Sequence, residues 1–275
     1  MSDATVFSSK LHSSHIFIIG GTSGVGLGVA AGSLEAHAAR VTISSSSDAR
    51  LESALAHLKS LYPSRASTVT GYTCDLSAPE GLETRIKGLL DTVTEGGQTK
   101  IDHIVFTAGN PLHLRPLHEV SYEEIVAAGT VRFFAPLLLA KNAFYGAYMA
   151  SAASASSITL TSGSASQKPP PGWTIPASYA AALRSVTRTL ALDLKPVRVN
   201  IVSPGPMDTA LWDAHGTTKE EIEAAKKSFG AQTVTGTLGR VEDVAECYLT
   251  SMRDKNMTGT CLNSNGVLAH LGGQA

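Results

Sequence analysis

Cysteine is scarce in this chain of 275 residues, which contains only Cys74, Cys247 and Cys261. Cysteines so few and so scattered exclude the disulfide framework of small secreted domains, and no two of them have the spacing of metal ligands. The nine histidines form no pair at metal-ligand spacing either. We therefore predict no metal, and we expect a reducing, cytoplasmic compartment.

An excess of one charge and long apolar runs are lacking as well. Lys and Arg together number 22 against 23 Asp and Glu, so neither nucleic acid nor an anionic membrane surface is an expected partner. Nowhere do about 18 apolar residues follow one another, and the first residues show no signal-peptide pattern. Hydrophobic residues make up 43% of the sequence, which is enough for one sizeable core. The expected partner is a small molecule.

Short apolar segments rich in β-branched residues alternate with helical patterns along the chain. This alternation predicts parallel strands with helices on both faces. We therefore predict an α/β fold, a Rossmann-like doubly wound parallel sheet of about seven strands, in a single domain over residues 1–275. Strands are expected at 15–19, 41–44, 66–72, 101–109, 156–162, 197–203 and 259–266, and helices after the first turn and at 48–61, 78–93, 121–149, 179–194 and 218–229.

A glycine-rich turn separates the first strand from the first helix. Glycines allow positive φ and a close approach of the backbone, and the free N–H groups of a helix N-terminus can hold a pyrophosphate. A flexible turn is the simpler reading, but the strand before it and the helix after it favour dinucleotide binding. The predicted cofactor residues of this turn are Gly20, Thr22, Ser23, Gly24, Val25 and Gly26.

The end of the second strand bears on the choice between NAD and NADP. A carboxylate there would repel a 2′-phosphate, but the chain has Ser44, Ser45, Ser46 and Ser47, with Asp48 and Arg50 only beyond them. We therefore predict NADP(H), although a solvated serine loop would look the same. At the end of the third strand, Asp75 and Leu76 are placed beside the adenine, with a helix cap as the alternative for Asp75.

Four motifs together resemble those of the short-chain dehydrogenase/reductase superfamily over nearly the whole chain. GGTSGVG resembles its TGxxxGxG turn with Ile19 in the Thr position, and FTAG at 106–109 resembles its NNAG with Thr107 for the second Asn. Tyr179 falls on the Tyr of YxxxK, and Ser203-Pro204-Gly205 on the segment that meets the nicotinamide. The resemblance implies further cofactor contacts at Ala108, Gly109, Tyr179, Pro204, Gly205, Met207 and Thr209.

The resemblance also implies a catalytic tetrad of Asn, Ser, Tyr and Lys, which this chain matches only in part. The Asn position falls on Thr130, the Ser on Ser162 with Ser164 as the alternative, the Tyr on Tyr179 and the Lys on Leu183. A free Tyr titrates near ~10, and a buried phenol without a neighbouring cation titrates higher. Arg184 points about 100° away around the helix and does not replace the Lys. Reduction of an iminium ion needs no acid, because it yields a neutral amine.

A narrower resemblance is to a fungal subgroup of that superfamily. The stretches GTVRFFAP, LTSGSASQKPPPGW and LDLKPVRVNIVSPGPMDTALW are similar to those of the NADPH-dependent reductase/Diels–Alderases of prenylated indole alkaloid biosynthesis, as in the malbrancheamide, paraherquamide and citrinadin pathways. Those enzymes reduce a cyclic iminium and guide an intramolecular [4+2] cycloaddition. The resemblance implies substrate-handling roles for Arg132 and Trp173, and it places Pro170 where the subgroup has an acid.

Other interpretations stay open at this stage. Trp173 could cap the core, and Arg132 could be a surface charge. The chain could be a ketone reductase in which Tyr179 and Ser162 work with an unrecognised cation, or a cofactor-bound binding protein without turnover. The resemblance further implies a homodimer or homotetramer that pairs through 121–149 and 179–194, and a substrate-covering segment at about 207–232.

Overall fold

The computed structural model describes residues 6–112, 114–150, 155–209 and 218–266. Its seven strands form one parallel sheet in the order β3-β2-β1-β4-β5-β6-β7, so the fold class is confirmed. The strand order reverses between β1 and β4, which is the point where ligands of doubly wound sheets bind. The strands are β1 (His15–Ile19), β2 (Arg40–Ser45), β3 (Val69–Thr73), β4 (His103–Phe106), β5 (Ser157–Thr161), β6 (Arg198–Pro204) and β7 (Cys261–Ser264).

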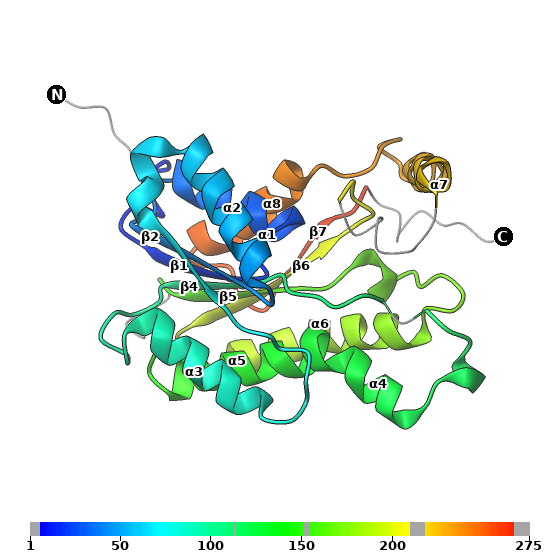
Figure 1. The fold of residues 1–275 in the computed structure, drawn as a ribbon, viewed down its shortest axis with the longest axis horizontal. Helices are drawn as coiled ribbons and strands as arrows, with labels where there is room; N and C mark the ends of the chain where they lie inside the picture. The colour runs from blue at the N-terminus through cyan, green and yellow to red at the C-terminus, as the bar shows by residue number, and fades with distance from the viewer. Residues whose placement is uncertain (1–5, 113, 151–154, 210–217, 267–275) are drawn as a thin grey trace.

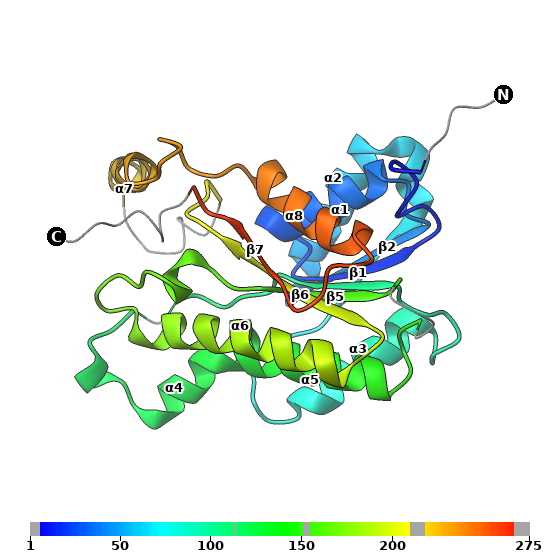
Figure 2. The same ribbon diagram turned by 180° about the vertical axis from the view of Figure 1, so that it is seen from behind.

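Helices cover both faces of the sheet (Figure 1). One face carries α1 (Gly24–Glu35), α2 (Asp48–Leu61) and α8 (Val241–Arg253), and the other carries α3 (Leu82–Thr94), α4 (Tyr122–Gly129), α5 (Ala135–Tyr145) and α6 (Thr174–Asp193). The remaining helix, α7 (Lys219–Ala231), stands outside both layers, as Figure 2 shows from behind. It lies at the end of the molecule toward which α4 also projects.

The strands are apolar on both sides because each side faces a helical layer. Successive side chains of a strand point to opposite faces. Accordingly, Ile16 and Ile18 belong to the core beneath α1 and α8, whereas Phe17 and Ile19 belong to the core beneath α3 and α5. The continuous apolar run in the sequence is therefore the pattern of a central strand that is buried on both faces of the sheet.

The first and the last helices of the α1–α8 layer pack at unusually close range. A Cβ added at Gly28 would lie 2.6 Å from Val241 Cγ1, and one added at Gly32 would lie 2.8 Å from Leu249 Cδ1. Two glycines one turn apart on α1 thus allow α8 to approach its backbone. Helix α8 was not among the expected helices, although its buried residues recur at helical spacing.

The prediction of one continuous helix at 121–149 is wrong, because the structure divides this range into two helices. Its start is confirmed, because Ser121 and Glu124 form a capping box. However, α4 ends at Gly129, a π-helical turn follows at Thr130–Phe134, and α5 ends at Tyr145. Pro136 at the start of α5 has no N–H for a regular helical hydrogen bond. This missing donor is the physical reason why the α-helical pattern breaks just ahead of Pro136.

Other element bounds differ by a few residues. The third strand begins at Val69 rather than at 66, because Pro63–Thr68 forms a 3₁₀ turn. Helix α6 begins at Thr174 rather than at Tyr179, and α3 begins at Leu82 rather than at 78. These corrections move no predicted site residue to another edge of the sheet.

Candidate active site

The glycine-rich turn is held tightly between β2 and β4. The N–H groups of Gly20 and Gly21 donate to the Ser44 carbonyl at 3.1 and 3.2 Å. Gly20 has φ +85°, and a Cβ on it would lie 2.5 Å from the Ala108 nitrogen. The Thr107 hydroxyl donates to the Ile19 carbonyl at 3.0 Å, so the predicted cofactor residues of both turns meet at the switch point.

The N-terminus of α1 has the properties of a phosphate-binding site. Ser23 has an extended backbone, its side chain does not cap the helix, and the first turn has no acidic residue. The Ser23 side chain thus does not occupy the first N–H groups of the helix, where the helix dipole favours an anion. Thr209 approaches from the segment after β6, with its Cγ2 3.6 Å from a Cβ placed on Gly24. The segment after β6 thus lies directly beside the start of α1.

Serine hydroxyls and one guanidinium gather at the end of β2. Ser45 Oγ accepts from the Thr22 hydroxyl and from the Ser47 N–H, each at 3.3 Å. Arg50 donates to Ser46 Oγ at 2.7 Å, and both residues are exposed. A guanidinium beside a hydroxyl suits a phosphate, so these residues fit a 2′-phosphate. Sequence analysis noted Arg50 but did not assign it to the site.

Asp75 lies in a local turn rather than at a helix cap. Its carboxylate accepts from the N–H and the hydroxyl of Ser77, both at 2.9 Å. Helix α3 begins only at Leu82, after Gly81, so the helix-cap alternative is wrong. Leu76 is buried. The placement of Asp75 beside an adenine stays a prediction.

The segment after β6 closes the other end of the predicted cofactor site. The Gly205 N–H donates to the Ser264 carbonyl at 2.9 Å, and a Cβ on Gly205 would lie 2.7 Å from Asn265 Cα. Pro204 ends β6, and Met207 forms a bridge with Gly239. Glycine is required here because the backbone of Asn265, the residue after β7, lies directly against it.

The predicted substrate-covering segment contains α7. Lys226 of this helix pairs with Asp208 at 2.8 Å and with Glu223 at 3.1 Å. Helix α7 is thereby tied to the position between Met207 and Thr209. Residues 210–217 of the predicted segment lie outside the described residues.

Three side chains at the tetrad positions donate to backbone carbonyls. The Thr130 hydroxyl donates to Val126 O at 3.0 Å, Tyr179 to Ile125 O at 3.0 Å and Ser162 to Ala180 O at 2.8 Å. The fourth position, Leu183, is 2% exposed within the core. Ser164 lies in a short 3₁₀ turn that follows β5. The structure therefore shows structural partners for these hydroxyls and no cation at the Lys position.

Aromatic packing fixes the ring of Tyr179. Its ring centroid lies 5.5 Å from that of Phe133 and 6.0 Å from that of Phe134. A Cβ on Gly129 would lie 2.6 Å from the Tyr179 hydroxyl oxygen, so glycine there makes room for the phenol. Burial raises the pKa of Tyr179, and the nearby Tyr122 adds to the rise. A phenol with a raised pKa is a poor proton donor near neutral pH.

Arg132 faces Gly109 and Asn110 at the end of β4. Its Nε donates to Asn110 Oδ1 at 3.1 Å, and one Nη donates to the Asn110 carbonyl. A Cβ on Gly109 would lie 2.8 Å from the guanidinium. Burial lowers the pKa of Arg132, with no carboxylate among the causes. Arg132 is thus a half-buried cation rather than a surface charge, and sequence analysis missed Asn110 even though it directly follows FTAG.

Trp173 precedes the first turn of α6. Its N–H donates to the Pro170 carbonyl at 3.2 Å, and its carbonyl accepts from the Ala177 N–H at 2.9 Å. The side chain is half-buried. The PPPGW loop therefore ends in the residue that starts α6, and a substrate contact of the indole stays a prediction.

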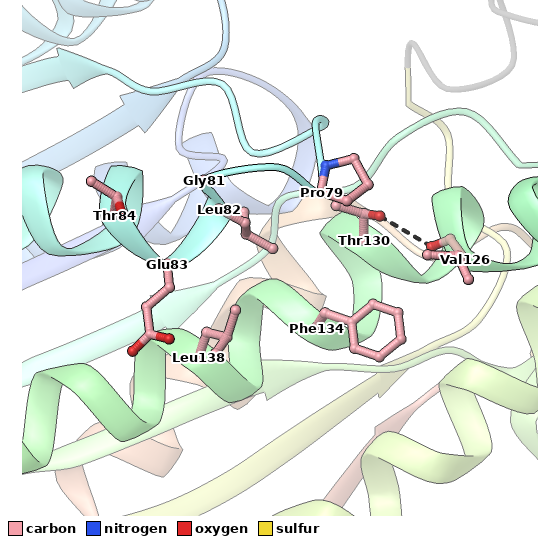
Figure 3. A pocket seen from close by; sticks show the side chains of 9 residues that line it. All are labelled: Pro79, Gly81, Leu82, Glu83, Thr84, Val126, Thr130, Phe134 and Leu138. Carbon is pink, nitrogen blue, oxygen red and sulfur yellow. Dashed lines mark hydrogen bonds between the residues drawn. The ribbon is translucent and has the colours of Figure 1, made fainter.

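A surface depression of about 350 Å³ lies between the start of α3 and the α4–α5 segment (Figure 3). Thr130 lines it, with its hydroxyl turned to Val126. The lining includes neither the glycine-rich turn nor Tyr179 or Arg132, so this depression is not the predicted cofactor site. The full lining is Pro79, Gly81, Leu82, Glu83, Thr84, Val126, Thr130, Phe134 and Leu138.

Comparison with known families agrees with this geometry. Residues 7–271 match the model of the SDR-like Rossmann domain, where SDR stands for short-chain dehydrogenase/reductase. The chain belongs to the short-chain dehydrogenase/reductase family. It is accordingly related to oxidoreductases that use a nicotinamide cofactor and small-molecule substrates.

Fungal members of the family resemble this short-chain dehydrogenase/reductase over nearly their full length. The short-chain dehydrogenase/reductase malC of Malbranchea aurantiaca is 41% identical over 93% of this chain and 94% of its own. The short-chain dehydrogenase/reductase fsr5 of Gibberella fujikuroi is 38% identical over 94% of this chain and 95% of its own. The solved structure of the MalC reductase/Diels–Alderase matches with a TM-score of 0.86 and 39% identity, over 95% of this chain and 98% of that one. These similarities confirm the predicted fungal subgroup.

Two further observations concern the described part of the chain. No helix in it is both long and apolar enough to cross a membrane. It also contains no group of three or more His, Cys, Asp or Glu side chains arranged to hold a metal ion.

Proposed function

We propose that this protein is an NADPH-dependent reductase of a cyclic iminium in fungal indole alkaloid biosynthesis, with intramolecular Diels–Alder activity. The observation that carries the proposal is the contrast between a well-formed cofactor turn and an absent proton-delivery pair. The Tyr179 hydroxyl donates to Ile125 O, and the Lys position is the buried Leu183. Hydride transfer is thus supported without general-acid catalysis.

The reaction balances without a proton. When bound, NADPH supplies a hydride. The iminium carbon accepts the hydride with its electron pair and forms a C–H bond, while the π electrons of C=N⁺ move to nitrogen and give a neutral amine. A ketone would instead leave an alkoxide that needs a proton, and a phenol with a raised pKa delivers one poorly. The site therefore favours an iminium over a ketone.

The residues at the two ends of the site support NADPH as the reductant. Gly24 and the uncapped start of α1 would hold the pyrophosphate. Ser46 and Arg50 would hold the 2′-phosphate that distinguishes NADPH from NADH. Pro204 and Gly205 would line the nicotinamide end.

The similarity to the MalC reductase/Diels–Alderase supports the second activity and the class of substrate. In this proposal, Arg132 and Trp173 contact a prenylated indole alkaloid precursor. Trp173 offers an aromatic face to the indole, and Arg132 offers N–H donors to an oxygen.

The test of the reductase proposal compares a cyclic iminium salt with the ketone of the same ring size. Purified protein with NADPH should consume the iminium and leave the ketone unchanged, as followed by the loss of reduced nicotinamide. Tyr179→Phe should retain the iminium activity to within about 10-fold. Tyr148→Phe is its matched control, because the Tyr148 hydroxyl donates to Asp91 on the surface. Reduction of the ketone alone would instead establish the ketone reductase, and NADPH binding without turnover of either compound would establish a binding protein.

The cycloaddition is tested on an azadiene that carries a tethered alkene. The protein should give one enantiomer in excess, whereas the reaction without protein gives a racemate. Racemic product at the uncatalysed rate would remove the Diels–Alder part of the proposal and leave the reductase part intact.

A further inference from the structure

Three successive carbonyl groups near the end of α4 accept hydrogen bonds from side chains. Ile125 O accepts from the Tyr179 hydroxyl at 3.0 Å, and Val126 O accepts from the Thr130 hydroxyl at 3.0 Å. Ala127 O accepts from Asn110 Nδ2 at 3.5 Å. The donors come from α6, from the π-turn and from the loop after β4. Three separate segments thus converge on one turn of backbone.

These three carbonyls lie directly before the π-turn at Thr130–Phe134. Hydrogen bonds run from residue i to i−4 in an α-helix and from i to i−5 in a π-helix. At this change the Thr130 N–H donates to Ala127 O, only three residues back, so the backbone already departs from the α-helical pattern at these carbonyls. The hydroxyls of Tyr179 and Thr130 and the amide of Asn110 therefore stabilise the transition from α4 to the π-turn.

Arg132 is carried by this same π-turn. Asn110 is bonded on both sides, since its Nδ2 donates to Ala127 O while its Oδ1 accepts from Arg132 Nε. The reverse orientation of the amide would place its NH₂ group against the guanidinium N–H. The amide of Asn110 therefore has one orientation, and the guanidinium is fixed by it.

We infer that Tyr179 and Asn110 are positioning residues for Arg132, and that Arg132 binds a carbonyl oxygen of the substrate apart from the C=N⁺ group. The inference rests on the proposed function. Tyr179 acts through the π-turn, and Asn110 acts on the guanidinium directly. Among the residues that the structure describes, the partner of Arg132 is the neutral Asn110 and no carboxylate acts on the Arg132 pKa, so nothing there compensates the charge of the guanidinium.

The electrostatics of the substrate explain why an oxygen is the partner. An iminium cation next to an uncompensated guanidinium would be repelled. A carbonyl oxygen carries partial negative charge and accepts N–H donors, of which a guanidinium has five. Two of these five donate to Asn110 within the described residues, and the others remain for such an oxygen.

The kinetic test is a set of double-mutant cycles with NADPH and a cyclic iminium that bears a ring carbonyl. Tyr179→Phe and Asn110→Ala should each lower kcat/KM about 3- to 10-fold, the effect of one lost hydrogen bond. In an Arg132→Gln background neither should lower it further. Tyr148→Phe should have no effect in either background. Additive losses, or a fall of about 10²-fold with Tyr179→Phe as expected for a lost general acid, would overturn the inference.

A second measurement needs no substrate and so separates this inference from the proposed function. In protein labelled with ¹⁵N, the Nε–H group of Arg132 should give an NMR signal that exchanges slowly with solvent. The signal is assigned by its disappearance from the spectrum of Arg132→Lys. Asn110→Ala should abolish the signal, Tyr179→Phe should shift it and speed its exchange, and Tyr148→Phe should leave it unchanged. A signal unmoved by both test variants contradicts the positioning role, whatever the activity. If Tyr179→Phe does not fold, Asn110→Ala alone decides.

Discussion

At the scale of single residues, Arg50 gives the clearest electrostatic test of the cofactor choice. Its guanidinium donates to Ser46 Oγ at 2.7 Å on the exposed end of β2. Arg50→Ala should weaken NADPH binding about 10- to 100-fold, because a charge-assisted bond to a phosphate is lost. NADH, which has no 2′-phosphate, should bind as before. Fluorescence titration with both cofactors checks this, and an equal loss for both would contradict the assignment of Arg50.

Gly26 and Gly88 form a matched pair that tests whether the cofactor turn requires glycine. A Cβ on Gly26 would lie 2.5 Å from Thr107 Oγ1 and would also meet the Gly20 carbonyl, whereas a Cβ on Gly88 would meet nothing within 4 Å. Gly26→Ala should therefore distort the cofactor turn and cost about 2 kcal/mol or more of stability. Gly88→Ala, at an exposed position within α3, should raise the free energy of unfolding by about 0.5–1 kcal/mol, because alanine favours the helix more than glycine does.

Urea unfolding and NADPH titration of both variants check these expectations. Gly88→Ala should bind NADPH as the natural chain does, while Gly26→Ala should bind it far more weakly. Normal cofactor affinity in Gly26→Ala would show that the turn can relax around a methyl group.

At the scale of elements, the amino ends of β1 and β4 carry buried histidines that make stability depend on pH. Burial lowers the pKa of His15 to about 4 and that of His103 to about 3, from an ordinary value of 6.5. Their rings bond Thr42 Oγ1 and Ser157 Oγ at 3.0 and 2.8 Å. Since the folded-state pKa is the lower one, the unfolded chain binds more protons between the two values.

The two histidines should therefore contribute fully to the free energy of unfolding above about pH 6.5. This free energy should fall as the pH drops toward 4, by up to about 1.4 kcal/mol per pH unit for each histidine. Urea unfolding between pH 7.5 and about 4.5 measures the slope. His103→Gln should flatten it, while His118→Gln should not, because the His118 side chain is 82% exposed. An unchanged slope in His103→Gln would exclude this histidine as a cause.

Local patterns predicted those elements whose signals lie within a few residues. Helix α2 has the expected bounds, and the capping box at Ser121 is present. The π-turn could not be predicted, because Ala and Leu at helical spacing fit an α-helix as well, and Pro136 was the only sign of a break. The partner of Arg132 could not be predicted either, because Asn110 reaches it across 22 positions of the chain. The sequence matches Tyr179 to the family motif, yet only its distant partner Ile125 reveals where the hydroxyl points.

At the scale of the whole molecule, we expect a homodimer or homotetramer that pairs through α5 and α6. Tyr145 and Leu192 on these helices are 69% and 72% exposed, whereas Leu139 and Ala140 of the apolar run at 136–140 are buried in the core. Leu192→Glu combined with Tyr145→Glu should shift the protein to monomers in sedimentation analysis, because a charge placed in an apolar interface is costly. Leu61→Glu on α2 is the control. A monomeric natural chain at tens of micromolar would contradict the expectation.

The close contact of Gly28 and Gly32 with α8 has a consequence for synthesis in the cell. The face of α1 that these glycines expose stays uncovered until residues 241–253 have left the ribosome, since α8 is what covers it. Residues up to Arg253 must therefore be synthesised before this layer can close. Until then the nascent chain exposes an apolar surface of the kind that chaperones bind. A chain truncated after Arg240 should accordingly bind a hydrophobic dye that the complete chain excludes.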